Sequence, residues 1–108
     1  MNNQHEKLAK GAWFKLSLME QLANIGSEVI RAINWKNKDN QEYSKLAFER
    51  ALELFDLTLA DTKNGQRLKE VARAREVLVD SFIDNHYQSS DEQWQKYFLE
   101  FNYAAQKL

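Results

Sequence analysis

Proline is absent from this chain of 108 residues, and glycine occurs only three times. Proline interrupts a helix interior at a cost of about 3 kcal/mol and is common in the turns of β proteins. Its absence therefore favours long helices joined by short loops. The length predicts a single domain spanning residues 1–108, because a chain of this size buries about two thirds of its unfolded surface around one core.

Apolar residues recur at helical spacing in four segments, at about 4–36, 40–61, 66–86 and 90–107. Their steps alternate between three and four, which is the period of an amphipathic helix that buries one face. No segment of useful length alternates with a period of two, as a strand would. We therefore predict an all-α fold, an up-down-up-down antiparallel four-helix bundle with short loops.

Residues that cap helices stand near the predicted boundaries. Three pairs have the spacing of a capping box: Asn3 with Glu6, Asp39 with Glu42, and Ser89 with Glu92. In such a box the two side chains satisfy backbone N–H groups that the first helical turn leaves without partners. Residues 61–65 close the second helix, because they end in Asn-Gly and both residue types tolerate positive φ.

Gly26 lies on the apolar face of the first predicted helix, where glycine costs about 1 kcal/mol relative to alanine. We expect it to let another segment approach closely, with Trp94 or Phe98 of the fourth helix filling the space. A hinge or a ligand channel is the alternative interpretation.

Composition excludes several classes of protein. Without cysteine there is no disulfide scaffold, thiolate zinc site or cysteine nucleophile. A net charge of -1 argues against a general binder of nucleic acid or anionic membranes. No apolar run approaches the roughly 18 residues of a membrane span, and the first six residues lack the apolar core of a signal peptide. We expect a cytoplasmic protein.

Neither a metal site nor a cofactor site is predicted. A di-iron bundle needs Glu-x-x-His pairs, which do not occur, and the chain has only His5 and His86. The Gly-x-Ser-x-Gly elbow and the phosphate-binding glycine loop are also missing. His86 stands at the predicted end of the third helix, where the helix dipole favours imidazolium, so we expect it to cap that helix. General acid–base chemistry is the alternative.

Two arginines interrupt apolar rows, Arg75 on the third predicted helix and Arg50 on the second. A guanidinium buried without a partner costs several kcal/mol, so each must be paired, lie at an interface or be exposed. The candidate partners are Glu28, Glu53 and Asp56. We expect a salt-bridge network that fixes helix register. The alternative is a polar site that binds an anion, a nucleotide or a partner's carboxylate.

This network has a measurable consequence. If Arg75→Ala leaves a buried acid unpaired, the fold should lose about 3 kcal/mol.

Aromatic residues crowd the fourth predicted helix, at Trp94, Tyr97, Phe98, Phe101 and Tyr103. One narrow face of a small bundle cannot bury all of these rings, so some must cover loops or join an interface. A homodimer that packs the first or the fourth helix against its twin would absorb them.

Three stretches, at residues 22–29, 50–58 and 73–80, resemble those of a group of small bacterial all-helical proteins. The size and helix order also resemble the HEPN superfamily and the helical proteins that accompany minimal nucleotidyltransferases. Ribonucleases of that superfamily carry an Arg followed a few residues later by a His. Here Arg75 precedes His86 by eleven positions, so this motif is missing.

The resemblance and the residues together predict a non-enzymatic helical interaction module. We expect a homodimer that serves as a HEPN-like partner of a nucleotidyltransferase-type protein. The alternative is a HEPN-like ribonuclease or a nucleotide- or anion-binding enzyme that uses Arg50, Arg75 and nearby acids between the helices. An unpaired Arg75 in an open cleft would favour the enzyme, whereas an Arg75 tied to Glu28 or Asp56 would favour the structural interpretation.

Overall fold

The computed structural model describes residues 11–106, and within that range it contains helices and no strand. A helical turn at residues 11–13 is followed by the α-helices α2 (Leu18–Asn37), α3 (Gln41–Leu59), α4 (Leu68–Ile83) and α5 (Asp91–Gln106). A 3-10 helix, η1 (Thr62–Arg67), connects α3 to α4. The all-α class is therefore confirmed. None of the described helices has the length and apolarity that crossing a membrane requires.

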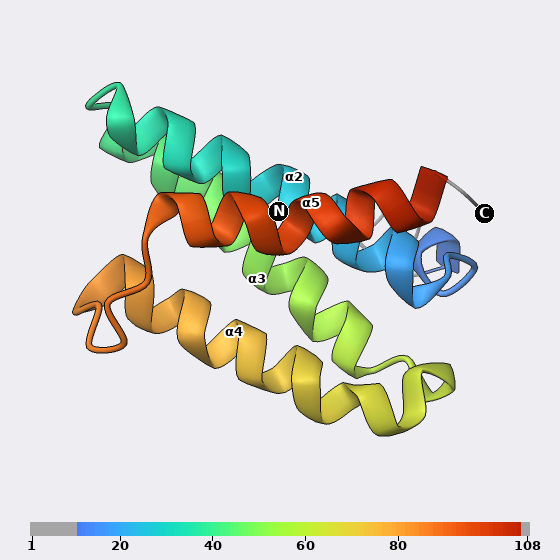
Figure 1. The fold of residues 1–108 in the computed structure, drawn as a ribbon. Helices are drawn as coiled ribbons and strands as arrows, with labels where there is room; N and C mark the ends of the chain where they lie inside the picture. The colour runs from blue at the N-terminus through green and yellow to red at the C-terminus, as the bar shows by residue number, and fades with distance from the viewer. Residues whose placement is uncertain (1–10, 107–108) are drawn as a thin grey trace.

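Helix α2 packs along both α3 and α5 (Figure 1). Consecutive helices run in opposite directions, and α4 lies below α3 in the view of Figure 1. Helix α4 packs mainly against α3 and η1 and leaves a groove between itself and α5. The arrangement is therefore more open on this side than a closed four-helix bundle.

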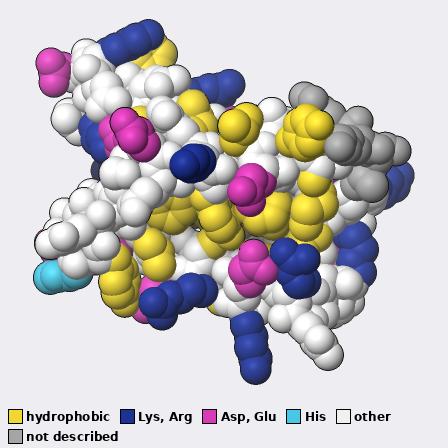
Figure 2. Space-filling model, viewed as in Figure 1, with side chains coloured by type: hydrophobic (Ala, Val, Ile, Leu, Met, Phe, Trp, Pro, Cys, Tyr) yellow, Lys and Arg dark blue, Asp and Glu magenta, His cyan; other side chains and the backbone are white. Residues whose placement is uncertain are grey.

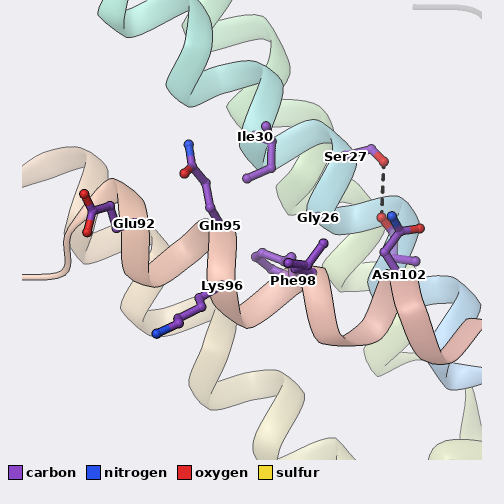
Figure 3. A pocket seen from close by; sticks show the side chains of 10 residues that line it. Gly26, Ser27, Ile30, Glu92, Gln95, Lys96, Phe98 and Asn102 are labelled. Atoms are coloured by element: carbon purple, nitrogen blue, oxygen red, sulfur yellow. Dashed lines mark hydrogen bonds between the residues drawn. The ribbon is translucent and has the colours of Figure 1, made fainter.

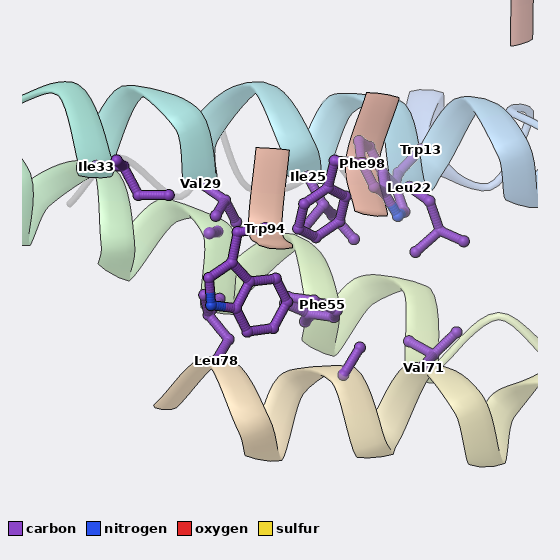
Figure 4. Close-up of a cluster of buried hydrophobic side chains, with 12 residues drawn as sticks. Trp13, Leu22, Ile25, Val29, Ile33, Phe55, Val71, Leu78, Trp94 and Phe98 are labelled. Atoms are coloured by element: carbon purple, nitrogen blue, oxygen red, sulfur yellow. The ribbon is translucent and has the colours of Figure 1, made fainter. Parts of the chain in front are cut away.

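The core lies where α2, α3 and α5 meet, with α4 covering its lower edge (Figure 4). Its most buried large apolar side chains, all at most 1% exposed, are Leu22, Ile25, Val29, Ile33, Phe55, Val71 and Leu78. Trp94 and Phe98 reach into it from α5. On α2, the flanking residues Ala23 and Ile30 are only half-buried, because that edge of the apolar face borders a second groove beside α5.

The prediction of one continuous helix from about residue 4 to residue 36 is wrong. The chain leaves the helical conformation at residues 14–17, and α2 begins after Ser17. Ser17 and Glu20 form a complete capping box, which favours a new helix start at this point. The predicted start near residue 4, with its Asn3–Glu6 cap, lies outside the described residues.

Two other caps differ from the prediction by one residue. Asn40, not Asp39, caps α3 by accepting a hydrogen bond from the Tyr43 N–H at 3.0 Å, and Asp39 takes a left-handed conformation with φ of 61°. At α5 the reciprocal box joins Ser90 to Gln93 and does not involve Ser89 and Glu92. Adjacent residues of capping type compete for each position, and sequence spacing alone does not rank them.

The helix predicted at residues 66–86 is shorter at both ends. Gly65, with φ of 51°, interrupts the helical conformation within η1, and α4 begins only at Leu68 and ends at Ile83. Beyond it, the Asp80 carboxylate accepts hydrogen bonds from the backbone N–H groups of His86 and Tyr87, both at 3.1 Å. His86 lies past the helix with its side chain 77% exposed, so its predicted capping role is wrong.

Candidate functional site

The predicted arginine–acid network separates into two ion pairs. Arg75 Nε lies 2.9 Å from Asp56 Oδ1 and joins α4 to α3. Arg50 Nε lies 3.7 Å from Glu28 Oε2 and joins α3 to α2. Glu53 is exposed and belongs to neither pair. The five residues therefore do not form one cluster.

Each ion pair is only partly exposed. The side chains of Asp56 and Arg50 are 60% and 55% exposed, whereas those of Arg75 and Glu28 are 32% and 16% exposed. A pair with one well-hydrated partner is expected to contribute about 0–1 kcal/mol, and Glu28 also pairs with Arg31 at 3.1 Å. Asp56 is one of the three acids predicted as partners of Arg75, and it is not buried. Neither arginine lines the grooves on the two sides of α5.

A buried set of polar side chains, which sequence analysis missed, fastens the segment before α2 to the end of α3 and to η1. We call it the amide cluster and define it as Trp13, Gln21, Thr58, Asp61 and Asn64, each at most 7% exposed. Gln21 Nε2 donates to the Trp13 carbonyl at 3.0 Å and to Asp61 Oδ2 at 2.9 Å. Asn64 Nδ2 donates to Gln21 Oε1 at 3.0 Å.

The remaining members close the amide cluster. Trp13 Nε1 donates to Thr58 Oγ1 at 3.0 Å, and that hydroxyl donates to the Leu54 carbonyl at 2.8 Å. Asn64 Nδ2 also donates to the Thr58 carbonyl at 3.1 Å. Because these groups hydrogen-bond to one another, the amide cluster joins parts of the fold and is not a binding site.

Asp61 carries the negative charge of the amide cluster, and Lys63 neutralises it. Burial acts to raise the pKa of the Asp61 carboxyl, but hydrogen bonds from Lys63 and Gln21 and the Lys63 charge outweigh it and lower the pKa below its usual 3.8. Lys63 Nζ pairs with Asp61 and also donates to the Phe14 carbonyl at 3.1 Å. The chain turn before α2 is thereby tied to η1.

Helices α2 and α5 approach each other closely at Gly26. A Cβ atom added at this position would lie 2.6 Å from Phe98 Cβ, closer than real side chains tolerate. The prediction that Gly26 admits Trp94 or Phe98 is therefore confirmed, with Phe98 as the neighbour. Figure 3 shows the Phe98 ring beneath the backbone at Gly26.

A groove of about 670 Å³ runs along this contact on the surface, and we call it the α2–α5 groove. Small side chains from α2, Ala23 and Ser27, form one wall together with Gly26, and Ile30 closes one end. On α5 the groove is bordered by Leu99, whose side chain is 63% exposed. In Figure 3, Gln95 extends along the opening toward Ile30, whereas Lys96 points away.

The outward surface of α5 combines this leucine with charges of alternating sign. Glu92, Lys96 and Glu100 follow one another at intervals of four residues, so they lie along one side of the helix. All three are exposed, and Leu99 stands between Lys96 and Glu100 along the chain. We call this surface the α5 outer face and define it by these four residues.

Comparisons of the chain with family models, curated proteins and solved structures return no match. The HEPN-like resemblance and the nucleotidyltransferase-type partner therefore stay predictions. Among the described residues, no three His, Cys, Asp or Glu side chains lie close enough together to hold a metal ion. The α2–α5 groove and the α5 outer face are therefore the surfaces on which a functional proposal can be based.

Proposed function

We propose that this chain is a non-enzymatic helical interaction module that forms a homodimer through the α5 outer face and the α2–α5 groove. In this proposal the four helices are an antiparallel up-down-up-down bundle, and α5 is its contact helix. The observation that carries the proposal is Leu99, a large apolar side chain that is 63% exposed beside a groove walled by small residues. Leu99 continues the apolar lining that Ile30 and Phe98 give this groove, and contiguous exposed apolar surface is typical of an interface.

The charges on α5 favour a second copy as the occupant. In a twofold contact the same patch appears on both sides, so it must be complementary to itself. A parallel pair would bring Lys96 against Lys96 and Glu100 against Glu100 of the two copies. An antiparallel pair centred on Leu99 instead brings Lys96 of each copy within reach of Glu100 of the other, and the two leucines meet at the axis.

The enzymatic alternative has less support. Arg50 and Arg75 are engaged with acids at the surface, and neither lines the α2–α5 groove. The condition stated for the enzyme was an unpaired Arg75 in an open cleft. Its pairing with Asp56 favours the structural interpretation.

Sedimentation equilibrium tests the dimer. The wild-type chain should sediment at twice its mass of 12.7 kDa at micromolar concentration. Leu99→Lys should weaken the dimer about a hundredfold, because it removes the central apolar contact and places two cations at the axis. Leu46→Lys is the matched control, since Leu46 is a comparably exposed leucine on α3 (47%) and its replacement should change nothing. A monomeric wild type, or equal effects of both substitutions, would refute the proposal.

Charge reversal separates the antiparallel contact from any other. Lys96→Glu should weaken the dimer about tenfold, because an acid at position 96 of each copy then faces Glu100 of the other. Adding Glu100→Lys to that variant should restore the wild-type dissociation constant. If the double variant dimerises no better than Lys96→Glu alone, the antiparallel register is wrong.

A further inference from the structure

A second groove lies on the other side of α5, where α4 stands apart from it. This α4–α5 groove has a volume of about 320 Å³. Ala74 and Val77 of α4 form one wall, and Trp94 and Tyr97 of α5 form the other. Figure 2 shows a band of apolar side chains along the trough between the two helices. This volume is at the lower end of the range for small-molecule sites, and an aromatic wall facing an aliphatic one is typical of such sites.

The charge at the mouth of the α4–α5 groove is positive. Glu70 lies at the mouth, but Arg67 Nε pairs with its carboxylate at 2.9 Å. Arg73 stacks over the Tyr87 ring at 5.4 Å, and none of the described acids lies within ion-pair distance of it. An anion that enters the mouth therefore meets one cation whose charge no carboxylate offsets.

Two polar groups lie within the aromatic wall. Trp94 is 7% exposed, and its indole N–H is buried without a hydrogen-bond partner among the described residues. In Figure 4 the Trp94 ring extends from α5 toward Leu78 of α4. Burial, with a smaller contribution from Glu70, raises the pKa of Tyr97 above its usual 10.0. The Tyr97 phenol is thus a neutral donor at physiological pH.

From these observations we propose that the α4–α5 groove binds a small amphiphile with an apolar body and a carboxylate head. The apolar body lies between Val77 and Trp94, and the carboxylate meets Arg73 at the mouth. Specificity for a carboxylate over a neutral head comes from the guanidinium, because a charge-assisted hydrogen bond is stronger than a neutral one. This site is separate from the surface proposed for dimerisation, since the two grooves share no residue.

Decanoate is a suitable probe, and NMR of the tryptophan indole N–H groups is a suitable readout. The chain has three tryptophans, and the Trp13 N–H is held by Thr58 in the amide cluster. Decanoate below its micellar concentration should shift the Trp94 indole resonance of the wild-type chain and leave that of Trp13 in place. The Trp94→Phe variant identifies the resonance by its disappearance.

Substitutions at the mouth test the carboxylate. Arg73→Gln should weaken decanoate binding about tenfold and leave the weaker binding of decanol unchanged, because only the charged head contacts the guanidinium. Arg50→Gln removes an exposed arginine elsewhere and should change neither. Val77→Trp should abolish binding of both compounds by filling the groove.

Three results would overturn the proposal. The first is a Trp94 resonance that does not move at millimolar decanoate, and the second is decanol binding as tightly as decanoate. The third is a Val77→Trp variant that stays folded and changes its oligomeric state without losing decanoate, because the groove would then be a contact between copies. Arg73→Gln alters an exposed side chain, so it stays informative if Val77→Trp fails to fold.

Discussion

The amide cluster and the two arginine–acid pairs both join separate helices through polar side chains, yet their surroundings differ completely. Gln21 and Thr58 are 0% exposed and hydrogen-bond inside the protein. The Asp56 side chain, which pairs with Arg75, is 60% exposed. A polar group deprived of water depends on its protein partner, whereas an exposed charge does not. Buried side chains that hydrogen-bond to one another therefore hold these helices together, whereas the arginine–acid pairs lie at the periphery of the fold.

The largest expected effect follows from removing the centre of the amide cluster. Gln21→Leu keeps the approximate volume but leaves Asp61, Asn64 and the Trp13 carbonyl without one partner each. We expect a loss of about 3 kcal/mol in the free energy of unfolding, because several buried polar groups lose their hydrogen bonds together. Urea denaturation followed by circular dichroism measures it. A loss below about 1 kcal/mol would remove the distinction between the two regions.

A smaller and pH-dependent effect is expected for Asp61→Asn. At pH 7 the variant should lose about 2 kcal/mol, because it lacks the charge that Lys63 and Gln21 contact. The folded-state pKa of Asp61 lies below its usual 3.8, so the wild type has this stabilisation above that pH and loses it as the pH falls through the folded value. The free energies of unfolding of the wild type and of Asp61→Asn, measured from pH 7 to pH 2, should therefore converge as the pH falls. A difference that stays constant over this range would contradict the assignment.

The smallest effect is expected for Arg75→Ala. Because Asp56 is left hydrated, the loss should be about 0.5 kcal/mol, well under the 3 kcal/mol expected for a buried pair. Arg50→Ala should behave similarly, because Glu28, although only 16% exposed, keeps its shorter ion pair with Arg31 at 3.1 Å. Thermal unfolding of both variants beside Gln21→Leu checks the order. A loss near 3 kcal/mol for either arginine would reverse the comparison.

The apolar spacing predicted the bounds of α3 and α5 to within about two residues. The position of Gly26 on the apolar face correctly predicted a close contact between two helices. Asp56 was one of three acids predicted as partners of Arg75, but the exposure of this acid was not predicted. Amphipathic spacing reports which face of a helix is apolar, but not how far the neighbouring helices spread apart.

The amide cluster was missed for a specific physical reason. Gln21 and Asn64 are residue types that usually face water, and their partners are distant along the chain, so no local pattern marks them. The start of α2 could have been predicted from the sequence, because Ser17 and Glu20 have capping-box spacing. The apolar spacing continues across this position, and it led to the prediction of one unbroken helix.

Disulfide cross-linking tests whether α5 pairs with α5 of a second copy. The chain contains no cysteine, so a single substitution gives one reactive position for each copy. A disulfide requires Cα atoms about 4.4–6.8 Å apart, a separation that two copies of residue 99 reach only near the twofold axis. Under mild oxidation, Leu99→Cys should become a covalent dimer while Leu46→Cys stays monomeric. Efficient cross-linking at residue 46 with none at residue 99 would contradict the account.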